Sequence, residues 1–439
     1  MRRHEAMVEV AKRGEAQIVF IGDSITHAFG GEPRTGESFL DRGRDTWELF
    51  YGVDKPLNLG ISGDRTQHVL WRLDNGGLGT CKPKVAVVMI GTNNAGSDTP
   101  DQIAEGVQAV CGRVKSLSPT TKILLLGIFP RDKAGSKLRA TVDGVNDRLA
   151  RWSKGGSVAY LDIGKAFLDG KGELGPDVMP DLLHPMGYGY RKWAMAMEPT
   201  LARLMGRKPK STLDARNSAV VPVPQNRNGA RPDWVGRHQA VLTYKGGNRC
   251  RLAFIGASII QFMGGPPTDR VSPAWHAYYA DRDAVDLGFS GDRTENVLWR
   301  LEQGEVDGMP LEAAIFMTGG NNTGSNSAEE IRDGVRAILN LFRAKQPKAA
   351  VLLHGIFPRG EKPDDVERVR AARVNVLLKQ LATELKVDYM DAGKVFLEKD
   401  GTISRETMPD FLHPSPRAYL RWQGGIESWV KSHVRKLPN

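Results

Sequence analysis

The chain repeats itself, and this duplication constrains the fold more than any other feature of the sequence. Short blocks of the first half return in the second half in the same order, and the central blocks are 228 positions apart (291 minus 63). One copy spans about 200 residues, which is the size of a domain and much longer than a solenoid repeat. The paired blocks begin at Gly22 and Gly256, Gly63 and Gly291, Val69 and Val297, Gly91 and Gly319, Gly127 and Gly355, and Met179 and Met408.

The duplication predicts two tandem domains, residues 1–206 and 234–439, joined by a linker at residues 207–233. The linker has prolines among basic and small polar residues and lacks apolar periodicity, which is typical of an extended connection. The chain has 439 residues, of which 40% are hydrophobic and 26% charged. These values are typical of a soluble protein with two ordinary domains.

Within each copy, short apolar runs alternate with helical patterns, which predicts a doubly wound parallel sheet. A capping box with proline at the first helical position starts a helix after Thr99, and Ser327 starts the matching helix of the second copy. The predicted strands of the first copy are Ile18–Ile21, Leu57–Leu59, Val85–Ile90, Ile123–Gly127 and Val158–Asp162.

Polar residues follow the apolar runs at their carboxyl ends, where open parallel sheets bind their ligands. Ser24 follows the first run, Gly63 the second and Asn93 the third. Asp181 and His184 lie beyond the fifth. Taken alone, Ser24 is better explained as a helix cap after a buried strand. The convergence of these positions in both copies favours a functional site.

These residue types are the ones that acyl transfer by a serine nucleophile requires. His184 can take the proton of Ser24, and Asp181, three residues earlier, can orient the imidazole ring. The backbone N–H groups of Ser24 and Gly63 and the side-chain amide of Asn93 are candidate donors to the oxyanion. The second copy offers Ser258, Asp410 and His413, with Gly291 and Asn321 as oxyanion donors.

The blocks around Ser24, Gly63, Asn93 and Asp181-x-x-His184 resemble those of the SGNH (GDSL) hydrolase family. The resemblance covers almost all of both copies. It implies the α/β class, with two tandem three-layer α/β/α (flavodoxin-like) domains that each contain a five-stranded parallel sheet. It also implies a Ser-His-Asp triad that needs no cofactor and hydrolyses small acyl esters.

More narrowly, the segments Leu57–Asp64, Val69–Leu73 and Gly91–Asn94 are similar to the catalytic subunits of intracellular platelet-activating-factor acetylhydrolase and their bacterial relatives. The bacterial relatives include many carbohydrate acetylesterases. We therefore predict a carboxylic ester hydrolase that forms an acyl-enzyme and removes acetyl groups, with a carbohydrate O-acetylesterase as the first choice. Hydrolysis of an acetylated phospholipid or of a small alcohol ester is the alternative.

The second copy departs from the family pattern at two supports of its site. Ala257 stands where the motif has aspartate, and Gly320 replaces the Thr92 of the first copy. The connection from nucleophile to oxyanion glycine is also six residues shorter in the second copy (39 minus 33), and the extra residues of the first copy fall in Gly30–Asp45. We predict that the first site is the stronger catalyst. The alternative is that domain 2 is a non-catalytic binding or scaffold copy.

Composition narrows the range of partners. The net charge is +10, which would allow an acidic partner. However, the basic residues are scattered along the chain and do not alternate with aromatic residues in one stripe, so we expect no nucleic-acid partner. No apolar run approaches the ~20 residues of a membrane span. We expect the partner to be a small-molecule or polysaccharide acyl ester. We also expect the two domains to pair within one chain, because the linker keeps their effective concentration high.

The sequence also contains no motif that indicates a metal site, a nucleotide site or a signal segment. The three cysteines and the Asp-x-x-His pair complete no metal-binding cluster, and no glycine-rich nucleotide motif is present, so we expect no metal or cofactor. The basic start of the chain has no apolar segment after it. We therefore expect a cytoplasmic protein, with a periplasmic or secreted location as the alternative if a signal segment is removed.

Overall fold

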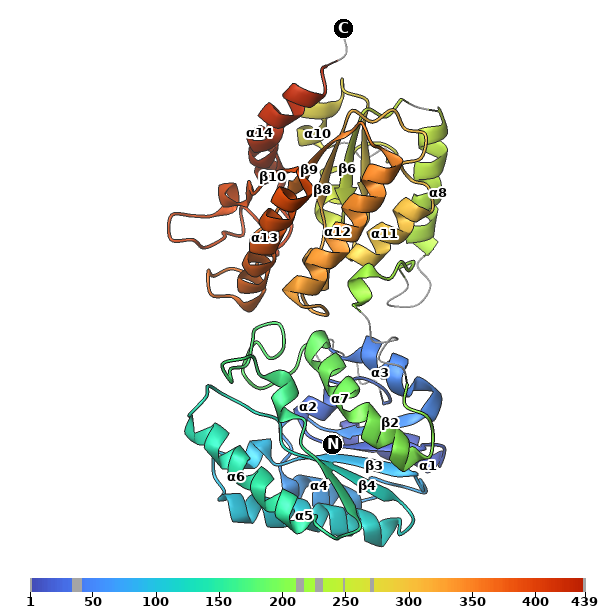
Figure 1. Cartoon of the computed structure of the whole chain (residues 1–439), viewed down its shortest axis with the longest axis vertical. Helices are drawn as coiled ribbons and strands as arrows, with labels where there is room; N and C mark the ends of the chain where they lie inside the picture. The colour runs from blue at the N-terminus through green and yellow to red at the C-terminus, as the bar shows by residue number, and fades with distance from the viewer. Residues whose placement is uncertain are drawn as a thin grey trace. The chain divides into compact units, whose positions relative to one another are not determined.

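The computed structural model describes residues 2–33, 42–210, 217–225, 232–247, 249–268 and 272–436. The chain divides into two compact units, Met1–Arg216 and Asn217–Asn439 (Figure 1). The strands of the first unit are β1 (Ile18–Gly22), β2 (Pro56–Gly60), β3 (Val85–Met89), β4 (Lys122–Leu126) and β5 (Val158–Leu161). Those of the second are β6 (Leu252–Gly256), β7 (Ala284–Gly288), β8 (Ala313–Met317), β9 (Ala350–His354) and β10 (Asp388–Met390).

The α-helices follow the same order in both units. In the first unit they are α1 (Arg2–Lys12), α2 (Ser24–His27), α3 (Arg44–Tyr51), α4 (Thr66–Asp74), α5 (Pro100–Leu117), α6 (Lys137–Trp152) and α7 (Gly187–Met205). In the second unit they are α8 (Pro232–Gly247), α9 (Ser258–Met263), α10 (Pro273–Tyr279), α11 (Thr294–Glu302), α12 (Ala328–Lys345), α13 (Val366–Leu385) and α14 (Pro416–His433).

Each unit contains one five-stranded parallel sheet, which confirms the predicted fold class. The strand orders are β2-β1-β3-β4-β5 and β10-β9-β8-β6-β7. All five strands predicted for the first copy are present, and none of their ends differs from the prediction by more than one residue. The predicted capping box also forms: the hydroxyl of Thr99 accepts the N–H of Gln102, and the Gln102 side chain accepts the N–H of Thr99.

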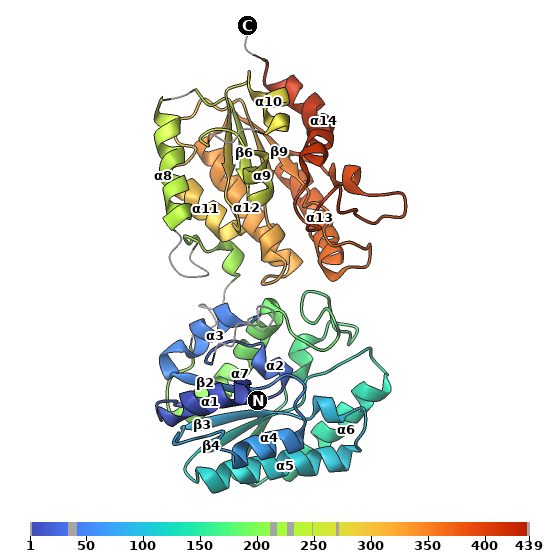
Figure 2. The ribbon, with the colours of Figure 1, turned by 180° about the vertical axis from the view of Figure 1, so that it is seen from behind.

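The side chains of each sheet alternate between two separate cores, as expected for strands that are buried on both faces. In β1, Ile18 and Phe20 lie in one core, and Val19 and Ile21 lie in the other. The first of these cores is covered by α2, α3 and α7, and the second by α1, α4, α5 and α6. In the second unit, α9, α10 and α14 cover one face, and α8, α11, α12 and α13 cover the other (Figures 1 and 2). Each unit is therefore a three-layer α/β/α sandwich.

The predicted linker, residues 207–233, is described only in part. Residues 211–216 and 226–231 lie outside the described residues. Residues 217–225, by contrast, pack on the second unit, and they include a short 3-10 helix, η5 (Ser218–Val220). The longer connection predicted after Ser24 includes residues 34–41, which also lie outside the described part of the chain.

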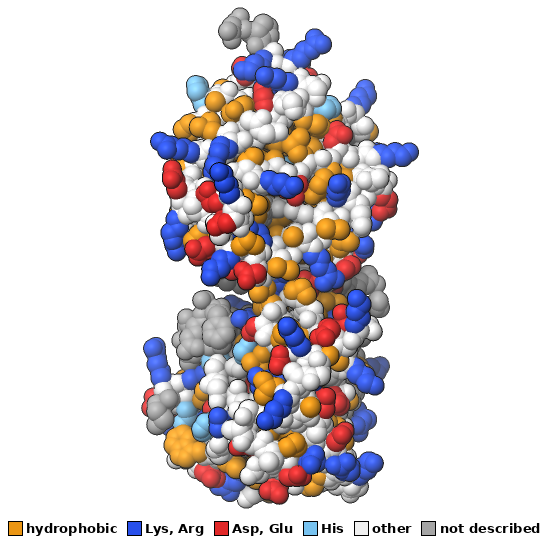
Figure 3. All heavy atoms as spheres, turned by 90° about the vertical axis from the view of Figure 1, so that its left-hand side faces the viewer, with side chains coloured by type: hydrophobic (Ala, Val, Ile, Leu, Met, Phe, Trp, Pro, Cys, Tyr) orange, Lys and Arg blue, Asp and Glu red, His pale blue; other side chains and the backbone are white. Residues whose placement is uncertain are grey.

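The molecular surface carries both signs of charge. On the face that Figure 3 shows, Lys and Arg side chains are interspersed with Asp and Glu side chains and do not gather in one stripe. Among the described residues, no helix is long and apolar enough to cross a membrane.

Phe20 provides a test of the first core. Its ring lies within 4.6 to 6.4 Å, centroid to centroid, of the rings of Trp47, Tyr51, Phe29 and Trp193. The substitution Phe20→Ala should lower the free energy of unfolding of the first unit by about 3–5 kcal/mol, because the packed rings around it would fill the resulting cavity only in part. Amide hydrogen exchange in peptides of residues 1–206 measures this loss. The control Leu49→Ala, at a side chain of α3 that is 47% exposed, should change it by less than about 0.5 kcal/mol.

Candidate active site

The candidate nucleophiles lie at the first turn after the first strand of each unit, β1 and β6, which is the second strand from one edge of its sheet. Ser24 is the first residue of α2 and follows β1 after one intervening residue, and Ser258 begins α9 in the same way after β6. Gly22 makes this tight turn possible, because a Cβ there would lie 2.5 Å from the carbonyl oxygen of Met89. The hydroxyl of Tyr190, in α7, holds the new helix in place by donating to the carbonyl oxygen of Ile25 at 2.6 Å.

In the first unit, the structure brings three predicted side chains into one hydrogen-bonded row. The Oγ of Ser24 lies 2.9 Å from the Nε2 of His184, and the Nδ1 of His184 lies 2.7 Å from the Oδ2 of Asp181. The other carboxylate oxygen of Asp181 accepts the backbone N–H groups of Leu183 and His184 at 3.1 and 2.7 Å. The turn between acid and base places Leu182 in the left-handed region, with φ at 58°.

The environment of Asp181 keeps it ionised. Partial burial alone would raise its pKa, but the hydrogen bonds from the side chain and backbone of His184 outweigh burial and lower the pKa to about 2. A carboxylate whose pKa is lowered in this way is charged at neutral pH and can stabilise a positively charged imidazole beside it. The negative charge of Asp181 therefore lies where it can stabilise the protonated form of His184, as a serine nucleophile with a histidine base requires.

The second unit repeats this geometry. The Oγ of Ser258 lies 2.8 Å from the Nε2 of His413, and the Nδ1 of His413 lies 2.6 Å from the Oδ2 of Asp410. The backbone N–H of His413 again donates to the other carboxylate oxygen, at 2.7 Å. Phe411 takes the left-handed conformation of the turn, with φ at 57°. Neither Ala257 nor Gly320 has disturbed the row.

The predicted oxyanion donors are held by one repeated contact. The Nδ2 of Asn93 donates to the carbonyl oxygen of Asp64 at 2.9 Å, which fixes the amide beside the loop that carries Gly63. An amide NH₂ has two hydrogens, so the second remains for a ligand. In the second unit the Nδ2 of Asn321 donates to the carbonyl oxygen of Asp292, also at 2.9 Å. Gly63 and Gly291 have φ values of 82° and 81°, a conformation that favours glycine.

An arginine that the sequence analysis did not assign to the site binds the loop that carries Gly63 to the sheet. This loop, and the corresponding loop with Gly291, is called the oxyanion loop below. Arg72, buried in α4, approaches the carboxylate of Asp64 to 2.6 Å. It also donates to the carbonyl oxygen of Leu59, in β2, at 2.9 Å and to that of Gly22, in β1, at 3.3 Å. It thus joins two strand ends to the residue after Gly63. Its only sequence signal was that both repeated blocks contain it, since it touches none of the reacting groups.

Arg300 makes the same contacts in the second unit. It donates to Asp292 at 2.8 Å, to the carbonyl oxygen of Leu287 at 3.2 Å and to that of Gly256 at 3.4 Å. It also pairs with a second carboxylate, that of Glu305. The two units therefore place their oxyanion loops by the same device.

The residue before the nucleophile differs between the two sites. In the first, Asp23 caps α2, because its Oδ1 accepts the N–H of Ile25 at 2.9 Å. Its Oδ2 has no hydrogen-bond partner among the described residues, and burial raises the pKa of Asp23 to about 7. In the second, Ala257 cannot cap α9. The first site thus contains a carboxyl group that is half protonated near neutral pH, and the second has a methyl group in its place.

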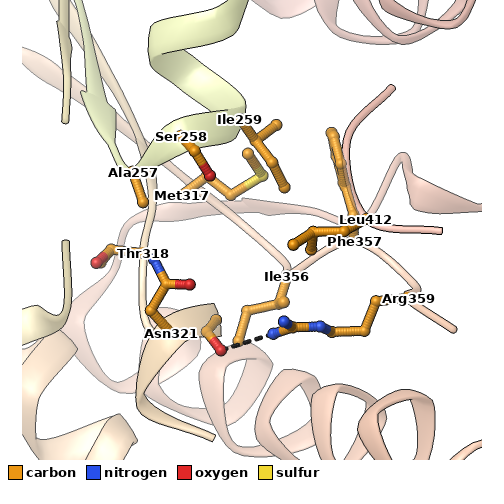
Figure 4. Close-up of a pocket in the computed structure, with 11 residues that line it drawn as sticks. Ala257, Ser258, Ile259, Met317, Thr318, Asn321, Ile356, Phe357, Arg359 and Leu412 are labelled. Carbon is orange, nitrogen blue, oxygen red and sulfur yellow. Dashed lines mark hydrogen bonds between the residues drawn. The ribbon is translucent and has the colours of Figure 1, made fainter. Parts of the chain in front are cut away.

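A small pocket opens beside Ser258 (Figure 4). Its volume is about 40 Å³. Ser258 and Asn321 lie on one side of it, and Phe357 and Leu412 face them from the other side (Figure 4). Arg359 extends along its floor and donates to the carbonyl oxygen of Gly320 at 2.8 Å. The lining is therefore largely apolar, with polar groups at the serine and at the floor.

Within the described ranges, no group of three or more His, Cys, Asp or Glu side chains is placed to hold a metal ion. A serine hydroxyl beside a histidine that an aspartate orients is the arrangement found in serine ester hydrolases, where the hydroxyl attacks a carbonyl carbon.

Comparison with known proteins agrees with this class and gives the family. The model of the GDSL-like lipase/acylhydrolase family matches residues 20–192 and again residues 254–421. The chain therefore belongs to the GDSL-like lipase/acylhydrolase family and contains two of its domains in tandem. It is an ester-hydrolysing enzyme by this membership.

Curated relatives include subunits of an acetylhydrolase. The chain is 33% identical over 223 residues to platelet-activating factor acetylhydrolase IB subunit alpha2 of Gallus gallus, covering 51% of this chain and 94% of the relative. It is 32% identical over 204 residues to the alpha1 subunit of Bos taurus, covering 46% and 84%. Among solved structures, it resembles a catalytic mutant of an acetylxylan esterase from Geobacillus stearothermophilus, with 21% identity, a TM-score of 0.36, and coverage of 46% of this chain and 99% of that one.

The raised pKa of Asp23 predicts a pH dependence of stability. An aspartate in an unfolded chain titrates near 4. Between about pH 4 and pH 7 the folded unit therefore holds a proton that the unfolded chain has lost, so its free energy of unfolding falls as pH rises. Asp23→Asn keeps the acceptor for Ile25 and removes the titration. In the Asp23→Asn variant, the fall in the free energy of unfolding between pH 5 and pH 7 should be smaller than in the parent protein by at least about 1 kcal/mol.

Hydrogen exchange at the two pH values, corrected for the intrinsic rates, measures this difference in the first unit. Asp23→Ala is the matched control, since it copies the second site and removes the cap as well. It should share the flatter pH dependence of Asp23→Asn but be less stable than that variant by about 1 kcal/mol at both pH values. An Asn variant with the slope of the parent protein would mean that Asp23 is ionised when folded.

Proposed function

We propose that both units hydrolyse short acyl esters, acetyl esters above all, with Ser24 and Ser258 as the nucleophiles. The observation that carries the proposal is the row of serine, histidine and aspartate, which recurs in both units with distances that agree within 0.1 Å. Divergence between the copies has changed neighbouring residues and left this row in place. A purely structural serine and histidine would not need the aspartate behind them.

In the proposed reaction, the Oγ of Ser24 attacks the acyl carbon while the Nε2 of His184 takes its proton. The negative charge that forms on the carbonyl oxygen is stabilised by the N–H groups of Ser24 and Gly63 and by the amide of Asn93. The alcohol leaves with the proton from His184, and the acyl group remains on Ser24. Water then attacks the acyl-enzyme, with His184 again as base, and acetate is released.

The size of the acyl group follows from the pocket beside Ser258. A volume of about 40 Å³ suits a small acyl group such as acetyl, which has three heavy atoms. The names of the relatives, platelet-activating factor acetylhydrolase subunits, also support an acetyl group. We place Ser24, Asp181 and His184 and their counterparts Ser258, Asp410 and His413 in the catalytic roles.

For the alcohol part we propose a carbohydrate. The guanidinium of Arg359 lies at the pocket beside Ser258 and is suited to hydrogen bonds with hydroxyl groups. The relatives favour a second candidate, an acetylated phospholipid, since their names refer to platelet-activating factor. A small alcohol ester fits the same chemistry. The three candidate substrates can be distinguished by comparing the rates at which the protein releases acetate from each of them.

The division of labour between the sites is tested with single serine variants. Ser24→Ala should remove most of the activity on p-nitrophenyl acetate, and Ser258→Ala should leave most of it, because Ala257 and Gly320 have altered the supports of the second site. Initial rates per mole of folded protein decide this, with the double variant as the control for background hydrolysis. The reverse ranking would show that the two changes are no handicap, and full activity in the double variant would overturn the proposed nucleophiles.

Substrate size is tested with a series of esters. In the Ser24→Ala protein, where only Ser258 acts, kcat/KM should fall at least about tenfold from acetyl to octanoyl p-nitrophenyl esters, because the longer chain would have to displace the apolar wall of the pocket beside Ser258. Acetate release from acetylated xylooligosaccharides should exceed that from an acetylated choline phospholipid at equal ester concentration. An octanoyl ester that reacts as fast as the acetyl ester would contradict the short-acyl assignment, and the opposite order of the natural esters would favour the phospholipid.

A further inference from the structure

The segment before α8, residues 217–225, is fixed along the second unit and is called the strap below. The hydroxyl of Thr294 donates to the carbonyl oxygen of Ala219 at 2.9 Å. The amide of Asn296 donates to the carbonyl oxygen of Val223 at 3.0 Å. Both donors lie in the first turn of α11. The strap therefore follows the start of α11 toward the loop that precedes this helix.

That loop carries the oxyanion glycine of the second site, and the strap ends against it. The Nε2 of Gln225 donates to the carbonyl oxygen of Ser290 at 3.1 Å and to the Oδ1 of Asp292 at 2.9 Å. These two residues flank Gly291 on either side. A Cβ on Gly291 would lie 3.4 Å from the same Nε2 atom, so the carboxamide is in contact with the glycine itself. Gln225 is 5% exposed, and water competes little for these hydrogen bonds.

The first site has no corresponding contact in the part of the chain that the structure describes. Apart from Gly63 and its two chain neighbours, no described residue has an atom within 4 Å of the position that a Cβ on Gly63 would occupy. Ser62 and Gly63 are exposed, whereas Ser290 and Gly291 are half-buried. The two oxyanion loops have the same backbone and the same arginine behind them. They differ in the side chain that touches the glycine.

We propose that Gln225 is a positioning residue of the second site, which holds the Gly291 N–H toward the oxyanion. A glycine with a positive φ has the fewest steric restraints of any residue, so its N–H keeps one direction only if neighbouring contacts restrict the loop. Hydrogen bonds on both sides of Gly291 supply this restriction. The second site needs it more than the first, because it lacks the Asp23 cap and the Thr92 side chain. This inference rests on the proposed esterase function of Ser258.

The test isolates the second site in the full-length Ser24→Ala protein. In that background, Gln225→Ala and Gln225→Met should both lower kcat on p-nitrophenyl acetate by about ten- to a hundredfold with KM little changed, since a misplaced donor weakens transition-state binding. The Met variant keeps the length of the side chain without its donors. Titration of active sites with a fluorophosphonate ester gives the rate per competent Ser258. A purely structural role would lower the number of titrated sites and leave the rate per site unchanged.

The matched control places the same substitutions in the Ser258→Ala protein, where only Ser24 acts. There Gln225→Ala and Gln225→Met should change kcat by less than twofold. A change of less than twofold at the second site, or an equal loss at both sites, would overturn the role of Gln225. If Ser258 neither turns over ester nor reacts with the fluorophosphonate in the Ser24→Ala parent, the proposed function of the second site fails first, and the inference fails with it.

Discussion

A buried arginine joined to a buried aspartate is the contact on which each candidate site depends. Arg72 reaches Asp64 at 2.6 Å and also binds the carbonyl oxygens at the ends of β1 and β2. Burying two charges costs several kcal/mol for each ion, which only good geometry and further hydrogen bonds offset. The arginine obtains these bonds from backbone carbonyls that parallel strands leave at their carboxyl ends. A contact of this kind adds little to net stability, but it holds the oxyanion loop at a fixed distance from the nucleophile.

The sequence was sufficient for the fold and for the residues that meet at the sheet edge. Apolar runs such as Ile18–Ile21 mark strands buried on both faces, and parallel topology brings their carboxyl ends together. Ser24 and Asn93 follow their strands closely, so their position at this edge is expected from the parallel topology. His184 is 160 positions from Ser24 and lies on a loop beyond β5, so its place in the site was inferred from its residue type and from its recurrence in the second copy. Their roles in catalysis stay predictions, since geometry alone does not measure a rate.

Other parts of the sites could not be predicted from local patterns. Arg72 lies on a helix, and only its contacts across three segments reveal that it supports Gly63. Gln225 lies in a stretch rich in proline and small polar residues, which reads as a linker because it has no apolar period. What orders this stretch is hydrogen bonding to another element, and such bonds leave no periodic signal. The raised pKa of Asp23 likewise arises from burial, which depends on the packed structure.

Because of the strap, the second unit includes residues that lie ahead of its copy of the repeat. The residues that join the domains in sequence also complete the second unit, because Ala219 and Val223 satisfy donors of α11 and Gln225 rests on Gly291. The structural border between the units therefore lies ahead of the strap, near residue 217, and not at the first helix of the repeat. Recombination that moved the second domain from α8 onward would carry its nucleophile, base and acid intact but leave part of its scaffold behind. The length of chain between the domains is thus free to vary only upstream of the strap.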